Sequence, residues 1–210
     1  MKAILKPLLS PLSLLLSLLL AFTAPSFAAA GASPDEQVKA TVNEVLGVLR
    51  EHKDKRTLRQ VAEQKVAPQF DFQEMTKLAV GRSWSQASPE QQKALETNFR
   101  SLLINTYTNA LSQASPGDKA LEVQPVPPNA GNDVTVKTRV RSASGQQPIA
   151  IDYRMSNSSG AWKVYDVAVE NLSLVTTYRS SFAEEIQRNG IDGLIKSLQT
   201  KNQSLASSAG

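Results

Sequence analysis

Apolar residues in the first half of the chain recur at helical intervals, and strong cap and stop signals interrupt them. This pattern predicts four helices, over residues 34–52, 55–67, 71–81 and 88–112. Ser33 and Glu36 form a capping box at the start of the first helix. Pro68 stops the second helix and Gly81 ends the third, because proline lacks a backbone N–H and glycine tolerates the left-handed C-cap conformation.

The second half of the chain begins with apolar residues at every second position, which is typical of half-buried strands. The alternation predicts strands over residues 121–126, 133–142 and 148–156, and a fourth strand that begins at Trp162. Turn signals separate the strands, so we expect an antiparallel meander. Val164 and Val167 in the fourth strand are three positions apart, so in a regular strand they would point to opposite faces of the sheet. A slip of one residue near Tyr165 and Asp166 therefore predicts a β-bulge, which bends the sheet.

Two more helices follow, over residues 175–189 and 192–201, with Gly190 as the cap between them. Helices, strands and helices in this order predict an α+β domain, with about six helices on one face of a four-stranded, curved antiparallel sheet. The bent sheet favours a concavity. The apolar stripes have two interpretations, because their residues could fill a core or line an apolar cavity that closes around a guest. These residues include Phe70, Phe72, Met75, Trp84, Phe99 and Tyr107.

The first 28 residues are typical of a signal peptide. Lys2 and Lys6 precede a leucine-rich run over residues 8–22, and Ser26 and Ala28 provide the small residues that a signal peptidase needs, so we expect cleavage after Ala28. The run is too short and broken for a comfortable membrane span, and no cysteine follows it that could carry a lipid anchor. We therefore expect an exported domain over residues 29–202 and a disordered tail over residues 203–210.

The net charge and the cysteine content of the chain say little about its function. Removing Lys2 and Lys6 lowers the formal net charge from +4 to +2, so the basic isoelectric point is weak support for nucleic-acid binding. The chain has no cysteine and hence no disulfide, and a domain of this length can be stabilised by its core alone.

No residue pattern requires an enzyme or a metal site. The single histidine, His52, lies among charged residues at a helix end, and no second histidine or any cysteine accompanies it. The mature chain contains no nucleophile-elbow, zinc-protease or S-x-x-K motif. Gly190 and Gly193 follow a helix rather than a strand, so they favour a helix cap over a phosphate loop. We expect neither catalytic residues nor a cofactor.

A row of basic residues occupies the polar face of the strand at residues 133–142, namely Lys137, Arg139 and Arg141. One interpretation is the solvent side of a sheet that is buried on one face. The other is a docking stripe for an acidic partner or a lipid phosphate.

Two long blocks of the sequence resemble a known family. The first is FDFQEMTKLAVGRSWSQASPEQQKALETNFRSLLINTYTNAL at residues 70–111, and the second is WKVYDVAVENLSLVTTYRSSF at residues 162–182, followed by GIDGLIKSLQTK. Both are similar to the MlaC-type (toluene-tolerance Ttg2) family of periplasmic phospholipid-binding proteins. With the exported start, the resemblance covers nearly the whole mature chain.

The resemblance implies a soluble carrier in the periplasm of a Gram-negative bacterium. Since nothing in the sequence indicates an obligate dimer, we expect a monomer. Its cargo would be phospholipid, moved between the outer and inner membranes to maintain outer-membrane lipid asymmetry and solvent tolerance. The implied partners are an inner-membrane ABC transporter with an MCE-domain subunit and an outer-membrane lipoprotein–porin complex. The family fold places acyl chains between the sheet and the helices, with the head group near the mouth.

Mapped onto this chain, the resemblance gives candidate lipid-binding residues in the inward positions of the matching blocks. They are Phe72, Met75, Leu78, Phe99, Leu103, Tyr107, Val136, Ile151, Tyr153, Val164, Val167, Val175 and Tyr178. Arg139 and Arg179 are the candidates for contact with the head group or a partner.

Two other classes compete with the carrier. A periplasmic binding protein for a small polar solute would need two hinged lobes, which a chain of this length barely allows. A hydrolase would need a nucleophile constellation that the motifs do not provide.

Overall fold

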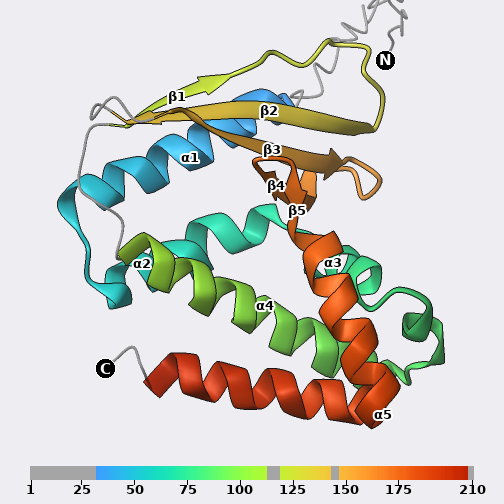
Figure 1. The fold of residues 1–210 in the computed structure, drawn as a ribbon. Helices are drawn as coiled ribbons and strands as arrows, with labels where there is room; N and C mark the ends of the chain where they lie inside the picture. Colours follow the sequence, from blue (N-terminus) through green and yellow to red (C-terminus); the bar gives the residue numbers. More distant parts are fainter. Residues whose placement is uncertain (1–31, 113–118, 143–146, 208–210) are drawn as a thin grey trace, which may run out of the picture. The chain divides into compact units, whose positions relative to one another are not determined.

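The computed structural model describes residues 32–112, 119–142 and 147–207. The signal peptide expected over residues 1–28 lies outside the described residues. Within them, the chain forms the helices α1 (Pro34–Glu51), α2 (Lys55–Val61), α3 (Phe72–Val80), α4 (Pro89–Ser112) and α5 (Leu174–Ser207). The strands are β1 (Lys119–Val123), β2 (Asp133–Ser142), β3 (Ile149–Ser156), β4 (Lys163–Val169) and β5 (Leu172–Ser173). The α+β fold is therefore as predicted (Figure 1).

The strands form one antiparallel meander in the order β1-β2-β3-β4-β5, which has five strands where the sequence predicted four. The additional strand, β5, pairs with β4 through a turn of two residues, Glu170 and Asn171, that joins Val169 to its partner Leu172. Both turn residues have positive φ, 49° and 66°. Such a turn matches the twist of a hairpin, but glutamate rarely adopts this conformation, so the sequence gives no ordinary turn signal here.

The predicted bulge in β4 is confirmed. Arg154 pairs with Asp166 and the next residue, Met155, pairs with Val164, so Tyr165 is an extra residue on β4. The extra residue changes the phase of the strand, and Val164 and Val167 consequently face the same side of the sheet. β2 alternates in burial as predicted, with Val134, Val136 and Thr138 buried and the basic residues Lys137, Arg139 and Arg141 exposed.

Helix boundaries follow the cap signals closely. The Asp71 side chain accepts a hydrogen bond from Glu74 N at 2.9 Å at the start of α3, and Gly81 ends that helix with a φ of 65°. The prediction of one regular helix over residues 55–67 was wrong. After α2 the chain forms a π-helical turn (Ala62–Val66) and then a 3₁₀ turn (Ala67–Gln69), because Pro68 lacks the N–H that a regular ladder requires.

α5 combines the two last predicted helices. Gly190, with a φ of 71° and a ψ of −177°, interrupts the helical backbone between them, as its predicted role as a cap requires. The expected disordered tail over residues 203–210 was wrong for its first part, since α5 continues as helix through Ser207. The reason is packing, because Leu205 lies against the helical core. Residues 208–210 lie outside the described residues.

The start of α5 is fixed to the sheet by a buried carboxylate. Asp166 on β4 is 2% exposed and accepts hydrogen bonds from Ser173 Oγ at 2.7 Å and Val175 N at 3.2 Å. The Arg154 guanidinium lies 3.9 Å away from the same carboxylate. This arrangement sets where α5 leaves the sheet.

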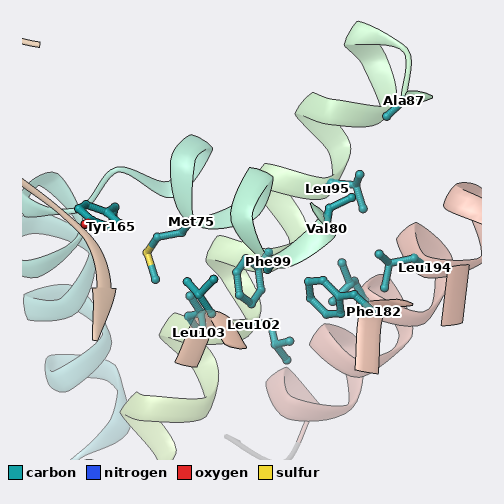
Figure 2. Close-up of a cluster of buried hydrophobic side chains, with 13 residues drawn as sticks. Met75, Val80, Ala87, Leu95, Phe99, Leu102, Leu103, Tyr165, Phe182 and Leu194 are labelled. Carbon is teal, nitrogen blue, oxygen red and sulfur yellow. The ribbon is translucent and has the colours of Figure 1, made fainter. Parts of the chain in front are cut away.

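Buried apolar side chains form two clusters. The first, which we call the helical core, lies among α3, α4 and α5, and Figure 2 shows Phe99 and Phe182 within it. The Phe99 ring meets the rings of Tyr178 and Phe182 edge-on, at 4.9 and 5.1 Å between centroids. The second lies between α1 and the sheet and includes Val38 and Val136. α1 thus covers the sheet directly, while α4 and the part of α5 after Gly190 lie in a further layer (Figure 1).

Candidate functional site

The two clusters do not close against each other completely, and an apolar cavity of about 430 Å³ remains between the sheet and the helices. Ligand cavities in proteins commonly measure about 300–1,000 Å³. The sheet side of the wall comes from β2, β3 and β4, and the helix side from α1, the π-helical turn, α3 and α4. The sides of the cavity are therefore built by elements that lie far apart in the sequence.

The lining residues of β3 show that the cavity runs along the sheet. Ile149 and Met155 both line it, and they are the first residue and the penultimate residue of β3. Six residue steps in a strand span roughly 20 Å. One leaflet of a bilayer has a hydrocarbon depth of about 15 Å, half of the bilayer core. The cavity is therefore long enough to accommodate an extended hydrocarbon chain.

The two ends of the cavity differ. Near Met155 and Val164, Gln37 Nε2 donates to Gln69 Oε1 at 2.8 Å and to the Trp162 carbonyl at 3.1 Å. These hydrogen bonds tie α1 to the 3₁₀ turn and to the residue that precedes β4. Elsewhere the wall reaches the surface at Tyr107, which is 37% exposed, and at Ile149, which is 48% exposed. We call these two residues the rim of the cavity.

Among the described residues, the wall carries no charged side chain, and its polar groups are amides and hydroxyls. Burial raises the pKa of Tyr107 to about 12, with a smaller contribution from the nearby Tyr178, and burial alone raises the pKa of Tyr153 to about 12. Both phenols are therefore neutral not only at physiological pH, as any tyrosine is, but also above pH 10.0. Because a buried charge without a partner is strongly unfavourable, such a wall suits the uncharged part of a ligand and leaves a charged group outside.

The structure places eight of the thirteen candidate lipid-binding residues on this wall. They are Phe72, Met75, Leu103, Tyr107, Ile151, Tyr153, Val164 and Val167. The other five candidates lie outside the wall. Leu78, Phe99, Val175 and Tyr178 belong to the helical core or pack against it, and Val136 is buried between the sheet and α1. Helical spacing identifies the inward face of a helix, but it does not distinguish a packed neighbour from an open space.

The two candidate head-group residues do not line the cavity. Arg139 is exposed on the outer face of β2, and Arg179 is exposed on α5, where its guanidinium lies near Gly81. Arg141, beside Arg139 on the same face, pairs with Glu122 at 2.8 Å, and both side chains are half exposed. Surface pairs of this kind contribute little to stability.

Sequence reasoning missed a large part of the wall. The missed residues include Val42, Val45 and Leu49 on α1, Ile104, Thr108 and Leu111 on α4, and Ile149 and Val169 on the sheet. The sequence did contain a signal for these wall residues, because several of them belong to the predicted apolar stripes of their helices. In the described part of the chain, no cluster of three or more acidic or histidine side chains could hold a metal ion, and no helix is both long and apolar enough to cross a membrane.

An α+β domain with a long, uncharged, apolar cavity between its sheet and its helices has the architecture of a protein that takes up an apolar ligand. Comparison with known proteins agrees with the resemblance found in the sequence. The chain belongs to the MlaC family, whose model, described as MlaC protein, matches residues 39–200.

Two curated relatives match most of the chain. The toluene tolerance protein ttg2D of Pseudomonas putida is 29% identical over 174 residues, which is 80% of each chain. The intermembrane phospholipid transport system binding protein MlaC of Haemophilus influenzae is 24% identical over 149 residues, which is 70% of this chain and 69% of the relative.

A solved structure has the same fold. It is the phospholipid-binding protein from Ralstonia solanacearum in complex with a phospholipid, and it is 36% identical to this chain. The superposition gives a TM-score of 0.74 and covers 83% of this chain and 99% of the Ralstonia chain.

Proposed function

We propose that this chain is a periplasmic phospholipid carrier that holds acyl chains in the cavity and transfers lipid between the outer and inner membranes. The observation that carries the proposal is the uncharged apolar cavity, about 430 Å³ in volume, in a fold shared with a protein solved in complex with a phospholipid. The names of the Pseudomonas and Haemophilus relatives, which refer to toluene tolerance and phospholipid transport, support the same function.

The physical chemistry of the cavity fits this role. Burying one methylene group is worth about 0.8 kcal/mol, so two long acyl chains gain on the order of 20 kcal/mol gross, before ordering and desolvation costs. A lipid held in this way leaves slowly into water. Transfer at a membrane then requires a partner that opens the cavity or replaces its walls. We propose the inner-membrane ABC transporter with its MCE-domain subunit and the outer-membrane lipoprotein–porin complex as these partners.

The proposal makes the protein a binder rather than an enzyme, with phospholipid as cargo and no cofactor. It also assigns the eight wall residues of the candidate set to contacts with the acyl chains. Arg139 and Arg179 would act at a head group or partner surface, since neither lines the cavity. Export and signal cleavage after Ala28 are part of the proposal, and the mass of the mature periplasmic protein tests that part directly.

The decisive experiment is extraction of the protein purified from the periplasm with organic solvent, followed by mass spectrometry and phosphate counting. Stoichiometric phospholipid is expected. A polar solute, or no ligand after mild purification, would overturn the proposal. Ile151→Asp places a charge on the cavity wall and should lose the lipid, whereas Lys137→Asp on the exposed face of the neighbouring strand should retain it. Circular dichroism of both variants checks that each is folded.

A further inference from the structure

Several threonines in the helices of this chain share one hydrogen bond that Thr108 lacks. The side-chain hydroxyl of a helical threonine commonly donates to the carbonyl four residues earlier. Thr41, Thr76, Thr177 and Thr200 do so, at 2.6–3.0 Å. Thr108 on α4 is 5% exposed, and its Oγ1 is buried without a hydrogen-bond partner in the chain.

The position of Thr108 points to a ligand. In the described part of the chain, three buried side-chain oxygens have no hydrogen-bond partner, and they belong to Asp35, Thr108 and Asn157. Of these three residues only Thr108 lines the cavity. A buried hydroxyl without a partner is unfavourable, so buried polar groups in folded proteins are almost always satisfied.

The level of Thr108 in the cavity indicates which ligand atom it meets. Thr108 follows the rim residue Tyr107, and neighbouring residues in a helix differ in height by only about 1.5 Å. The described residues of the wall carry no charge, so the phosphate of a phospholipid would stay outside the rim. The ester groups of a glycerophospholipid connect the phosphate end of the molecule to the acyl chains, and they would therefore lie just inside the rim.

We propose that the Thr108 hydroxyl donates a hydrogen bond to an ester carbonyl oxygen of the bound glycerophospholipid, which makes Thr108 a specificity-determining residue. The inference rests on the proposed function, because it names the part of the lipid that this position recognises. It predicts a preference for ester-linked over ether-linked lipids, since an ether-linked chain has no carbonyl oxygen to accept the bond.

The test compares dipalmitoyl phosphatidylethanolamine with its diether analogue, which has the same head group and chain length, in binding to lipid-free protein. Thr108→Val removes the hydroxyl and keeps the shape, whereas Thr108→Ser keeps the hydroxyl. Thr41→Val is the matched control, because Thr41 lines the same cavity but its hydroxyl donates to the Gln37 carbonyl at 3.0 Å. Wild type, Thr108→Ser and Thr41→Val should prefer the diester about fivefold, and Thr108→Val should bind both lipids equally.

The outcomes separate this inference from the proposed function. Equal binding of the two lipids by wild type, or a preference that persists in Thr108→Val, overturns the role of Thr108 and leaves the carrier function intact. Failure of wild type to bind either lipid overturns both. Lipid-free Thr108→Val should melt no lower than wild type, because it loses an unpaired buried hydroxyl. A lower melting temperature for this variant than for Thr41→Val would mean that the hydroxyl has a partner within the chain, and would also refute the inference.

Discussion

Two leucines on the same helix offer a direct test of whether the interior is hollow. Leu95 and Leu103 both lie on α4 and in the helical core, and they are 0% and 6% exposed. Leu103 lines the cavity, but Leu95 does not. Replacing either residue with alanine removes the same three carbon atoms from the same kind of helical site, so differences in helix propensity cancel.

The expected losses of stability in lipid-free protein differ because the surroundings differ. Removing three buried carbons costs about 2.4 kcal/mol at 0.8 kcal/mol each. At Leu95 the packed neighbours leave a new void, which raises the total towards the upper part of the known range, about 4 kcal/mol. At Leu103 the removed atoms already border open space, so fewer contacts disappear and we expect about 2 kcal/mol.

Urea unfolding with linear extrapolation measures both losses, provided that the two variants keep the same dependence on denaturant. A second measurement follows the transfer of bound phospholipid to acceptor vesicles. Leu103→Ala should release lipid faster than wild type, while Leu95→Ala should release it at the wild-type rate. Equal losses of stability together with equal release rates would refute the assignment of Leu103 to the wall and the picture of a hollow interior.

Three other predictions follow from the structure. Asp166→Ala should lower the free energy of unfolding by about 3 kcal/mol, because it removes two charge-assisted hydrogen bonds at the start of α5. Arg154→Gln should lower it by less than about 1 kcal/mol, since the guanidinium is half exposed and lies 3.9 Å from the Asp166 carboxylate. Urea titration of both variants checks these values. The stability of lipid-free protein should fall as the pH rises from 10.0 to about 12. In this interval tyrosine ionises in the unfolded chain, while Tyr107 and Tyr153 in the folded protein remain neutral. Urea unfolding across the interval should show a shallower fall for Tyr153→Phe. Removal of bound phospholipid should lower the melting temperature, since a ligand at a thousand times its Kd stabilises the folded state by about 4 kcal/mol. Equal melting temperatures for loaded and lipid-free protein would contradict the proposed cargo.

Local signals were sufficient for most of the secondary structure. Asp71, Gly81 and Gly190 act through their own backbone and immediate neighbours, so their caps are visible in the sequence and the observed boundaries agree within a residue or two. The bulge at Tyr165 was also predictable, because an extra residue shifts the phase of every apolar position that follows it in the strand.

The features that the sequence did not reveal depend on contacts with distant residues. The tail helix through Ser207 exists because Leu205 packs against the helical core, and a short, polar tail gives no local sign of this. The buried role of Asp166 was similarly hidden. A carboxylate in a strand is usually a solvated group, and only the pairing of β5 with β4 and the start of α5 bring the Ser173 and Val175 donors to it.

The order of apolar and polar residues along the chain was enough to predict an α+β domain and the inward face of each element, and two blocks of the sequence resemble a lipid-binding family. It could not determine which inward residues meet a neighbour and which meet open space. Phe99 and Leu103 lie four positions apart on one face of α4, yet Phe99 is enclosed by aromatic rings while Leu103 lines the cavity. Only the assembled fold resolves this point, because periodicity fixes the direction of a side chain, whereas the distance to the facing layer depends on the curvature of the sheet and on how the helices pack against it.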